Sequence, residues 1–131
     1  MFGTAWNYGG NDGGVAFEVD ASGNYSVTYN FCARANCTDG SEPLDLGGLA
    51  IDPSGNLYGT AANGGKNKGG TVFKLSGSTL SVLHSFCPKG NCATGGASPR
   101  GSLLQDSSGN LFGTTEYGGK HGQGVIFEWT P

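Results

Sequence analysis

The segment GNLYGTAANGG at residues 55–65 recurs as GNLFGTTEYGG at residues 109–119, and the chain opens with a related segment, MFGTAWNYGG, at residues 1–10. Other markers repeat at similar intervals: two cysteine-containing segments, YNFCARANC and HSFCPKGNC, begin 55 residues apart. A third set lies 56 and 54 residues apart, namely Phe17, Phe73 and Phe127. Self-similarity at a fixed period indicates a repeat architecture. The sequence therefore predicts tandem units of about 55 residues.

Each unit has the pattern of four short strands. In the complete copy these are GLAID, NLYGTA, GTVFKL and LSVLHSF, which are rich in the β-branched and aromatic residues that strands favour. Tight turns join them, as at residues 53–55, where Gly55 permits a positive φ and Asp52 can bond the turn backbone. No long stretch has a helical apolar period. We predict an all-β protein of β-propeller-like blades, each with four antiparallel strands.

The copies define one repeat domain over residues 1–131. Its three blades are expected at residues 1–31, 49–86 and 101–131, with the cysteine-containing loops between them. The first copy starts at the second strand and the last ends at the third, so ten strands are expected. Middle strands packed between blades should be apolar on both faces, as with Val125, Ile126, Phe127 and Trp129. The open strand edges predict pairing with copies of the chain or with the rest of a longer chain.

Composition and motifs exclude several functions. The net charge is −3 with a pI of about 5.1, and no basic stripe is present, which argues against nucleic acid as a partner. No apolar run approaches the roughly 20 residues of a membrane span, and no signal peptide is visible. Neither a G-x-S-x-G nor an H-E-x-x-H motif occurs, so no catalytic residue, enzymatic activity or cofactor is predicted. Asp52 and Asp106 fit turn capping better than calcium binding.

Four cysteines form two C-x4-C pairs at equivalent repeat positions. Local disulfides, a zinc ion held by four thiolates and free thiols are the three interpretations. Structural zinc sites more often have C-x2-C spacing, so we favour disulfides Cys32–Cys37 and Cys87–Cys92 and predict no metal. Disulfides indicate an oxidising compartment, and an extracellular or cell-surface location is therefore predicted.

The pattern D-x-x-G-N-L-Y-G-T-T…G-G…G-T-V-F-K-L…L-H-S-F resembles the GloVer (Gloeo/Verruco) tandem repeat of bacterial surface and secreted proteins. The full pattern covers residues 49–86, with partial copies on either side. The resemblance implies a propeller-like array in an exported chain. The cysteine pairs are a departure from that pattern.

The longest loops follow the second and fourth strands of each unit, and loops on a rigid scaffold are where binding residues tend to lie. Candidate ligand-binding residues in these loops are Trp6, Asn7, Tyr8, Asn63, Glu116 and Tyr117. Their aromatic rings could stack on an extracellular glycan. The open strand edges are stronger evidence about function than the loop aromatics, because an unpaired edge must be covered. We therefore predict a non-enzymatic structural module that self-assembles, and a glycan-binding, lectin-like module is the alternative.

Overall fold

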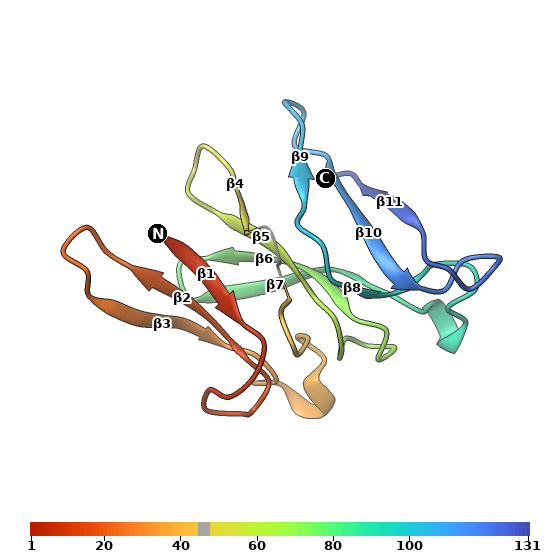
Figure 1. Ribbon diagram of the computed structural model, residues 1–131, viewed down its shortest axis with the longest axis horizontal. Coiled ribbons are helices and arrows are strands. Elements are labelled where there is room, and N and C mark those ends of the chain that lie inside the picture. The colour runs from red at the N-terminus through yellow and green to blue at the C-terminus, as the bar shows by residue number, and fades with distance from the viewer. Residues whose placement is uncertain (45–47) are drawn as a thin grey trace.

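The computed structural model describes residues 1–44 and 48–131, which form three antiparallel β-sheets (Figure 1). The first sheet contains β1 (Phe2–Ala5), β2 (Val15–Val19) and β3 (Tyr25–Asn30). The second contains β4 (Ala50–Ile51), β5 (Leu57–Ala61), β6 (Thr71–Ser76) and β7 (Thr79–Ser85). The third contains β8 (Ala97–Pro99), β9 (Leu104–Gln105), β10 (Leu111–Tyr117) and β11 (Ile126–Trp129).

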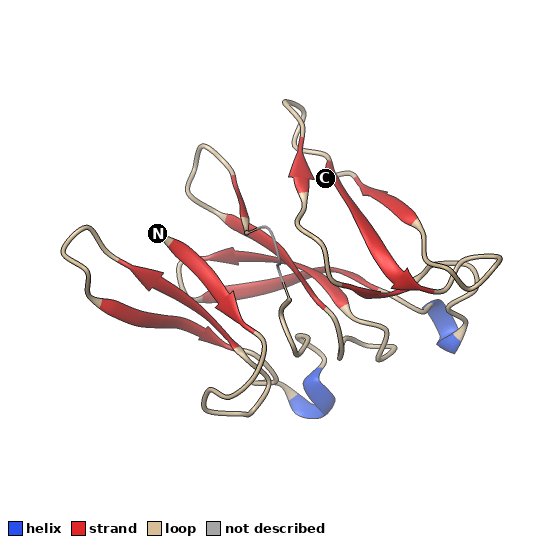
Figure 2. Cartoon of the chain, in the orientation of Figure 1, coloured by secondary structure: helices blue, strands red, loops and turns tan. Residues whose placement is uncertain are grey.

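The predicted all-β class is confirmed. The helices within the described ranges are two single 3-10 turns, η1 (Ala35–Cys37) and η2 (Pro88–Gly90), one in each cysteine loop (Figure 2). The strand count differs from the prediction, because the described residues form eleven strands rather than ten. The additional strand is β8, which pairs with the end of β10 through Thr115↔Pro99 and Tyr117↔Ala97.

The register shows that the units are structurally equivalent. Gly3 pairs with Phe17, Gly59 with Phe73 and Gly113 with Phe127, so the repeated phenylalanine always lies across from a glycine. The first two sheets also share a bulge at one position, between Ala16 and Phe17 and between Val72 and Phe73. Such bulges bend a strand and increase its twist.

Three turns use an Asp-x-Ser-Gly-Asn sequence, and in each the aspartate organises the turn. Asp52 accepts hydrogen bonds from the Ser54 amide (2.9 Å), the Asn56 amide (2.9 Å) and Asn56 Nδ2 (2.7 Å). Asp106 makes the same contacts before β10, which confirms the predicted capping role of both aspartates. Asp20 does so between β2 and β3, a different hairpin. The turn is therefore a connector used at two places within the unit.

Apolar faces of neighbouring sheets pack against each other in two core clusters. The cluster between the first and second sheets includes Phe31 and Phe73, whose ring centroids are 5.0 Å apart. The cluster between the second and third sheets includes Phe86 and Phe127, also 5.0 Å apart. The second sheet contributes Phe73 to one cluster and Val72 to the other, because adjacent strand residues point to opposite faces.

Each cysteine loop connects one sheet to the next. We call the interface between the first and second sheets, with its cysteine loop, the first joint, and the interface between the second and third sheets, with its cysteine loop, the second joint. Both predicted disulfides are present, Cys32–Cys37 in the first joint and Cys87–Cys92 in the second. In the first joint the Gly65 amide donates to the Cys37 carbonyl (2.9 Å), and in the second Gly119 donates to Cys92 (3.0 Å). Each loop therefore binds the long loop of the following unit.

Candidate functional site

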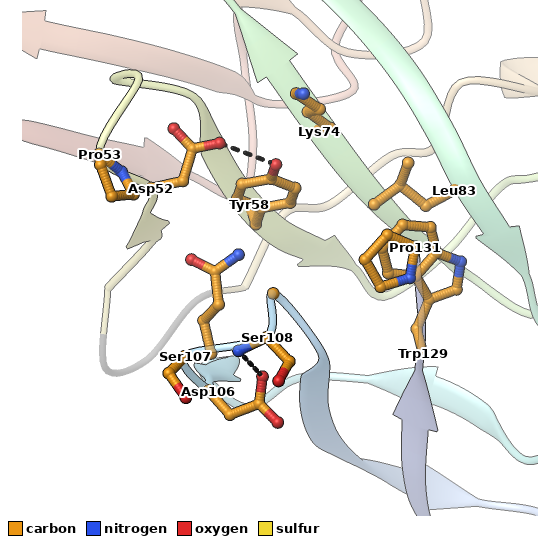
Figure 3. Close-up of a pocket in the computed structure, with 12 residues that line it drawn as sticks. Asp52, Pro53, Tyr58, Lys74, Leu83, Asp106, Ser107, Ser108, Trp129 and Pro131 are labelled. Carbon is orange, nitrogen blue, oxygen red and sulfur yellow. Dashed lines mark hydrogen bonds between the residues drawn. The ribbon is translucent and has the colours of Figure 1, made fainter.

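A groove with a volume of about 540 Å³ lies between the second and third sheets (Figure 3). Its lining includes Pro53 and Ser107, which belong to the tight turns before β5 and β10. These turns lie at the end of the sheets opposite the long loops (Figure 1). Its polar and aromatic lining includes Asp52, Tyr58, Lys74, Asp106 and Trp129. Sequence reasoning directed attention to the long loops and did not identify this groove.

The groove carboxylates are engaged by their own turns. Asp52 accepts a further hydrogen bond from the Tyr58 hydroxyl (3.0 Å), visible in Figure 3. The hydrogen bond from the Asn56 side chain is the main reason that the pKa of Asp52 is lowered to about 2. The Asn110 side chain likewise lowers the pKa of Asp106. Both groups are therefore ionised near neutral pH and are poor general acids.

Tyr58 and its neighbour Lys74 provide the groove with an aromatic ring, a hydroxyl group and a cation. Burial and the bond to Asp52 raise the pKa of Tyr58, so its hydroxyl stays protonated. Lys74 Nζ lies 5.7 Å from the centroid of the Tyr58 ring, at cation–π distance. Hydrogen bonding and ring stacking are the chemistry that these groups offer.

A similar groove occurs at the first joint, with a volume of about 240 Å³. There Phe2 occupies the position of Tyr58, Glu18 that of Lys74 and Leu75 that of Trp129. The groove is therefore a recurring gap between adjacent sheets, and its polar lining is not conserved between the two joints.

The six loop residues proposed as a ligand site are distributed over all three sheets. Trp6, Asn7 and Tyr8 follow β1 in the first sheet, Asn63 follows β5 in the second, and Glu116 and Tyr117 end β10 in the third. Trp6, Tyr8 and Tyr117 are exposed, as stacking on a ligand would require. Asn63 forms a backbone bridge with Ser41, and Glu116 makes an ion pair with Arg100 (2.6 Å).

The outer faces of the two end sheets are the other candidate site. On the third sheet, Ile126 is 84% exposed, whereas the equivalent Val72 of the second sheet is 0% exposed. On the first sheet, Met1 is 78% exposed, whereas the equivalent Leu57 is 4% exposed. The expectation that Ile126 is buried on a middle strand is therefore wrong, because no sheet or strand formed by residues 1–44 and 48–131 covers it.

Both end faces carry further apolar residues. Exposed Tyr25 and Val27 lie on the first sheet at the positions of Leu80 and Val82, which belong to the first joint. Exposed Leu104 lies on the third sheet. Contiguous exposed apolar surface marks sites of interaction. The two surfaces are equivalent to those that face each other in the internal joints.

Within residues 1–44 and 48–131, no cluster of three or more His, Cys, Asp or Glu side chains is suited to hold a metal ion. The same residues contain no helix with the length and apolar character to cross a membrane.

The sequence model of one family, described as the Gloeobacter/Verrucomicrobia repeat, matches residues 1–131. None of the curated proteins matches this sequence.

Proposed function

The chain belongs to the Gloeobacter/Verrucomicrobia repeat family. We propose that this repeat protein is a non-enzymatic structural module that self-assembles through the outer faces of its end sheets. The observation that carries the proposal is the exposure of Ile126 and Met1 at positions that are buried in the internal joints. Removing such apolar surface from water is favourable by roughly 25 cal/mol per Å². Association through the two end faces would remove this apolar surface from water.

The architecture supports the same proposal. The sheets pack face to face in sequence order, as the blades of a propeller do, and we propose that they are such blades. Propellers typically have about four to eight blades, whereas this chain supplies three sheets. A ring or a filament would require sheets from further copies or from further sequence.

The two disulfides fit a protein that functions outside the cell, since such bonds persist in oxidising compartments. We extend the proposal to an extracellular or cell-surface location. The disulfides stabilise the loops that connect successive sheets, which suits a module whose role is to hold its shape.

Light scattering and sedimentation over a range of protein concentrations test the proposal. The wild-type chain should associate, and Ile126→Lys should weaken association while leaving the circular dichroism spectrum unchanged, because this side chain is 84% exposed. Ser22→Lys, at the exposed turn between β2 and β3, is the matched control and should behave as wild type. A wild-type monomer near 13.3 kDa at every concentration would refute self-assembly.

Glycan binding is the second candidate, supported by the exposure of Trp6, Tyr8 and Tyr117. Aromatic rings with one exposed face are suited to stacking on sugar rings. Because these residues lie in different sheets, an extended glycan would have to bridge them, or each would act separately. A glycan array is the test: saturable binding that is lost in Trp6→Ala would favour this function over the structural one.

A further inference from the structure

Each internal joint depends on a glycine in the following unit, where the cysteine loop packs on the backbone. Gly64 has a φ of 73°, and a Cβ placed on it would lie 2.5 Å from the Cys37 carbonyl oxygen. Gly118 occupies the equivalent position, where a Cβ would lie even closer to the Cys92 oxygen. Contacts with backbone atoms at such distances cannot be relieved by moving a side chain. This position must be glycine where a cysteine loop is seated.

Each joint also depends on a glycine in the preceding unit. A Cβ on Gly13 would lie 2.6 Å from Cys32 Cβ, and a Cβ on Gly69 would lie 2.6 Å from Cys87 Sγ. The two glycines of a joint therefore contact the same cysteine loop, one from each adjoining sheet. The pairs are Gly13 with Gly64, and Gly69 with Gly118.

The end sheets carry larger residues at these two positions. Tyr8 is equivalent to Gly64, and it retains the same left-handed backbone with a φ of 66°. Gln123 is equivalent to Gly69. Tyr8 is 76% exposed and Gln123 is exposed as well, so both side chains are accessible to a partner. A cysteine loop of the internal kind could not be seated against either residue.

We infer that the partner of each end face is a second copy of this chain, docked head to tail through a joint that has no cysteine loop. In this joint the third sheet of one copy packs on the first sheet of the next. Tyr8 and Gln123, on opposite sides, occupy the space that the loop fills in the internal joints. The inference rests on the proposed self-assembly and specifies its geometry.

Other residues of the end faces fit a joint of this kind. In each internal joint, a phenylalanine next to the cysteine loop packs on the repeated phenylalanine of the following sheet. Phe31 packs on Phe73 in the first joint, and Phe86 packs on Phe127 in the second. In the first sheet, Phe17 instead contacts Tyr25 of its own sheet, at 5.3 Å between ring centroids. The first sheet thus supplies its own aromatic neighbour where a loop-derived one is missing. A heterologous contact of this type builds a ring if its rotation closes and a filament if it does not.

Cross-linking between copies tests the geometry. Separately purified Y8C and Q123C chains are mixed and treated with a short bis-maleimide, and S22C mixed with Q123C is the control. Intact mass first confirms that both native disulfides are closed. The expected product is a mixed dimer of Y8C and Q123C in excess of either homotypic dimer, with only background yield from the S22C mixture.

A second variant does not depend on cross-linking. The double substitution Y8G/Q123G should fold as wild type, because both side chains are exposed. It should weaken self-association about tenfold, which corresponds to about 1.4 kcal/mol.

Failure of this inference can be told apart from failure of the proposed function. A wild-type chain that stays monomeric overturns both. A chain that associates but gives homotypic Y8C dimers, equal yields in all mixtures or no effect of Y8G/Q123G overturns the head-to-tail joint alone.

Discussion

Alanine substitution of the repeated phenylalanine should cost very different amounts of stability in different sheets. Phe73 is fully buried between two sheets and packs on Phe31, so Phe73→Ala removes a complete core side chain. Such truncations cost about 3–5 kcal/mol. Phe17 has the same place in its unit but is only partly buried, with Tyr25 as its ring neighbour. Phe17→Ala should cost about 1–2 kcal/mol, a fraction of the value for complete burial.

Urea denaturation followed by far-ultraviolet circular dichroism measures both costs. With a slope of about 1–3 kcal/mol per molar urea, Phe73→Ala should lower the midpoint by about 1 M or more. At the same slope, Phe17→Ala should shift the midpoint by less than half as much as Phe73→Ala, because its expected cost is about 1–2 rather than about 3–5 kcal/mol. The protein must be dilute enough to be monomeric, because association would bury Phe17 and reduce the difference between the stability losses of the two variants.

Equal losses from the two substitutions in the monomer would refute the reasoning. That result would mean that the outer face of the first sheet is covered within the chain, in conflict with the exposure of Met1 and Tyr25. A small loss from Phe73→Ala would instead show that the first joint contributes little to stability.

Two further predictions concern polar groups. The buried carboxylate of Asp39 accepts hydrogen bonds from the Tyr29 hydroxyl (2.7 Å) and from the amides of Ala33 (2.9 Å) and Arg34 (3.2 Å). Asp39→Ala should therefore lower the free energy of unfolding by about 2–4 kcal/mol, since each abandoned donor is costly, whereas Thr94→Ala in the second cysteine loop should be nearly neutral in thermal melts. The pKa of Asp52 falls from 3.8 to about 2 on folding, so its stabilising contribution is complete above about pH 4 and is lost as the pH decreases towards 2. Acid titration of Asp52→Asn should give a shallower loss of stability than wild type, and identical titration curves would contradict this.

The unit and its hairpins could be predicted from the sequence because both depend on local patterns. The alternation around Phe73 and the Asp52 turn are fixed by residues a few positions apart, and the structure confirms both. Strand β8 could not be predicted in the same way. Its three residues have no strand pattern, and Ser98 has a positive φ of 55°. The strand follows the second cysteine loop and is defined by its pairing with β10, a residue contact that its own sequence does not indicate.

Which side chains are buried between neighbouring sheets also could not be predicted from local sequence patterns. Ile126 and Val72 occupy equivalent positions in similar strands, and only the presence of a neighbouring sheet makes one exposed and the other buried. The same holds for the candidate site. The sequence shows that residue 8 is a tyrosine. Its role in the proposed joint can be inferred only from the structure, in which the equivalent Gly64 lies against the Cys37 carbonyl. The groove near Trp129 was missed because its residues come from two sheets.

The Asp-x-Ser-Gly-Asn turns have a consequence for the order in which the chain folds. Among the described residues, the groups that donate hydrogen bonds to the aspartate side chain of each turn lie within six residues of it, so the turn can form before any sheet is complete. Hairpins closed by such turns form on the microsecond scale. The ring contact of Phe31 with Phe73 joins residues 42 positions apart and must wait for a larger loop to close. The hairpins should therefore be the early folding units, and the joints between sheets should form last.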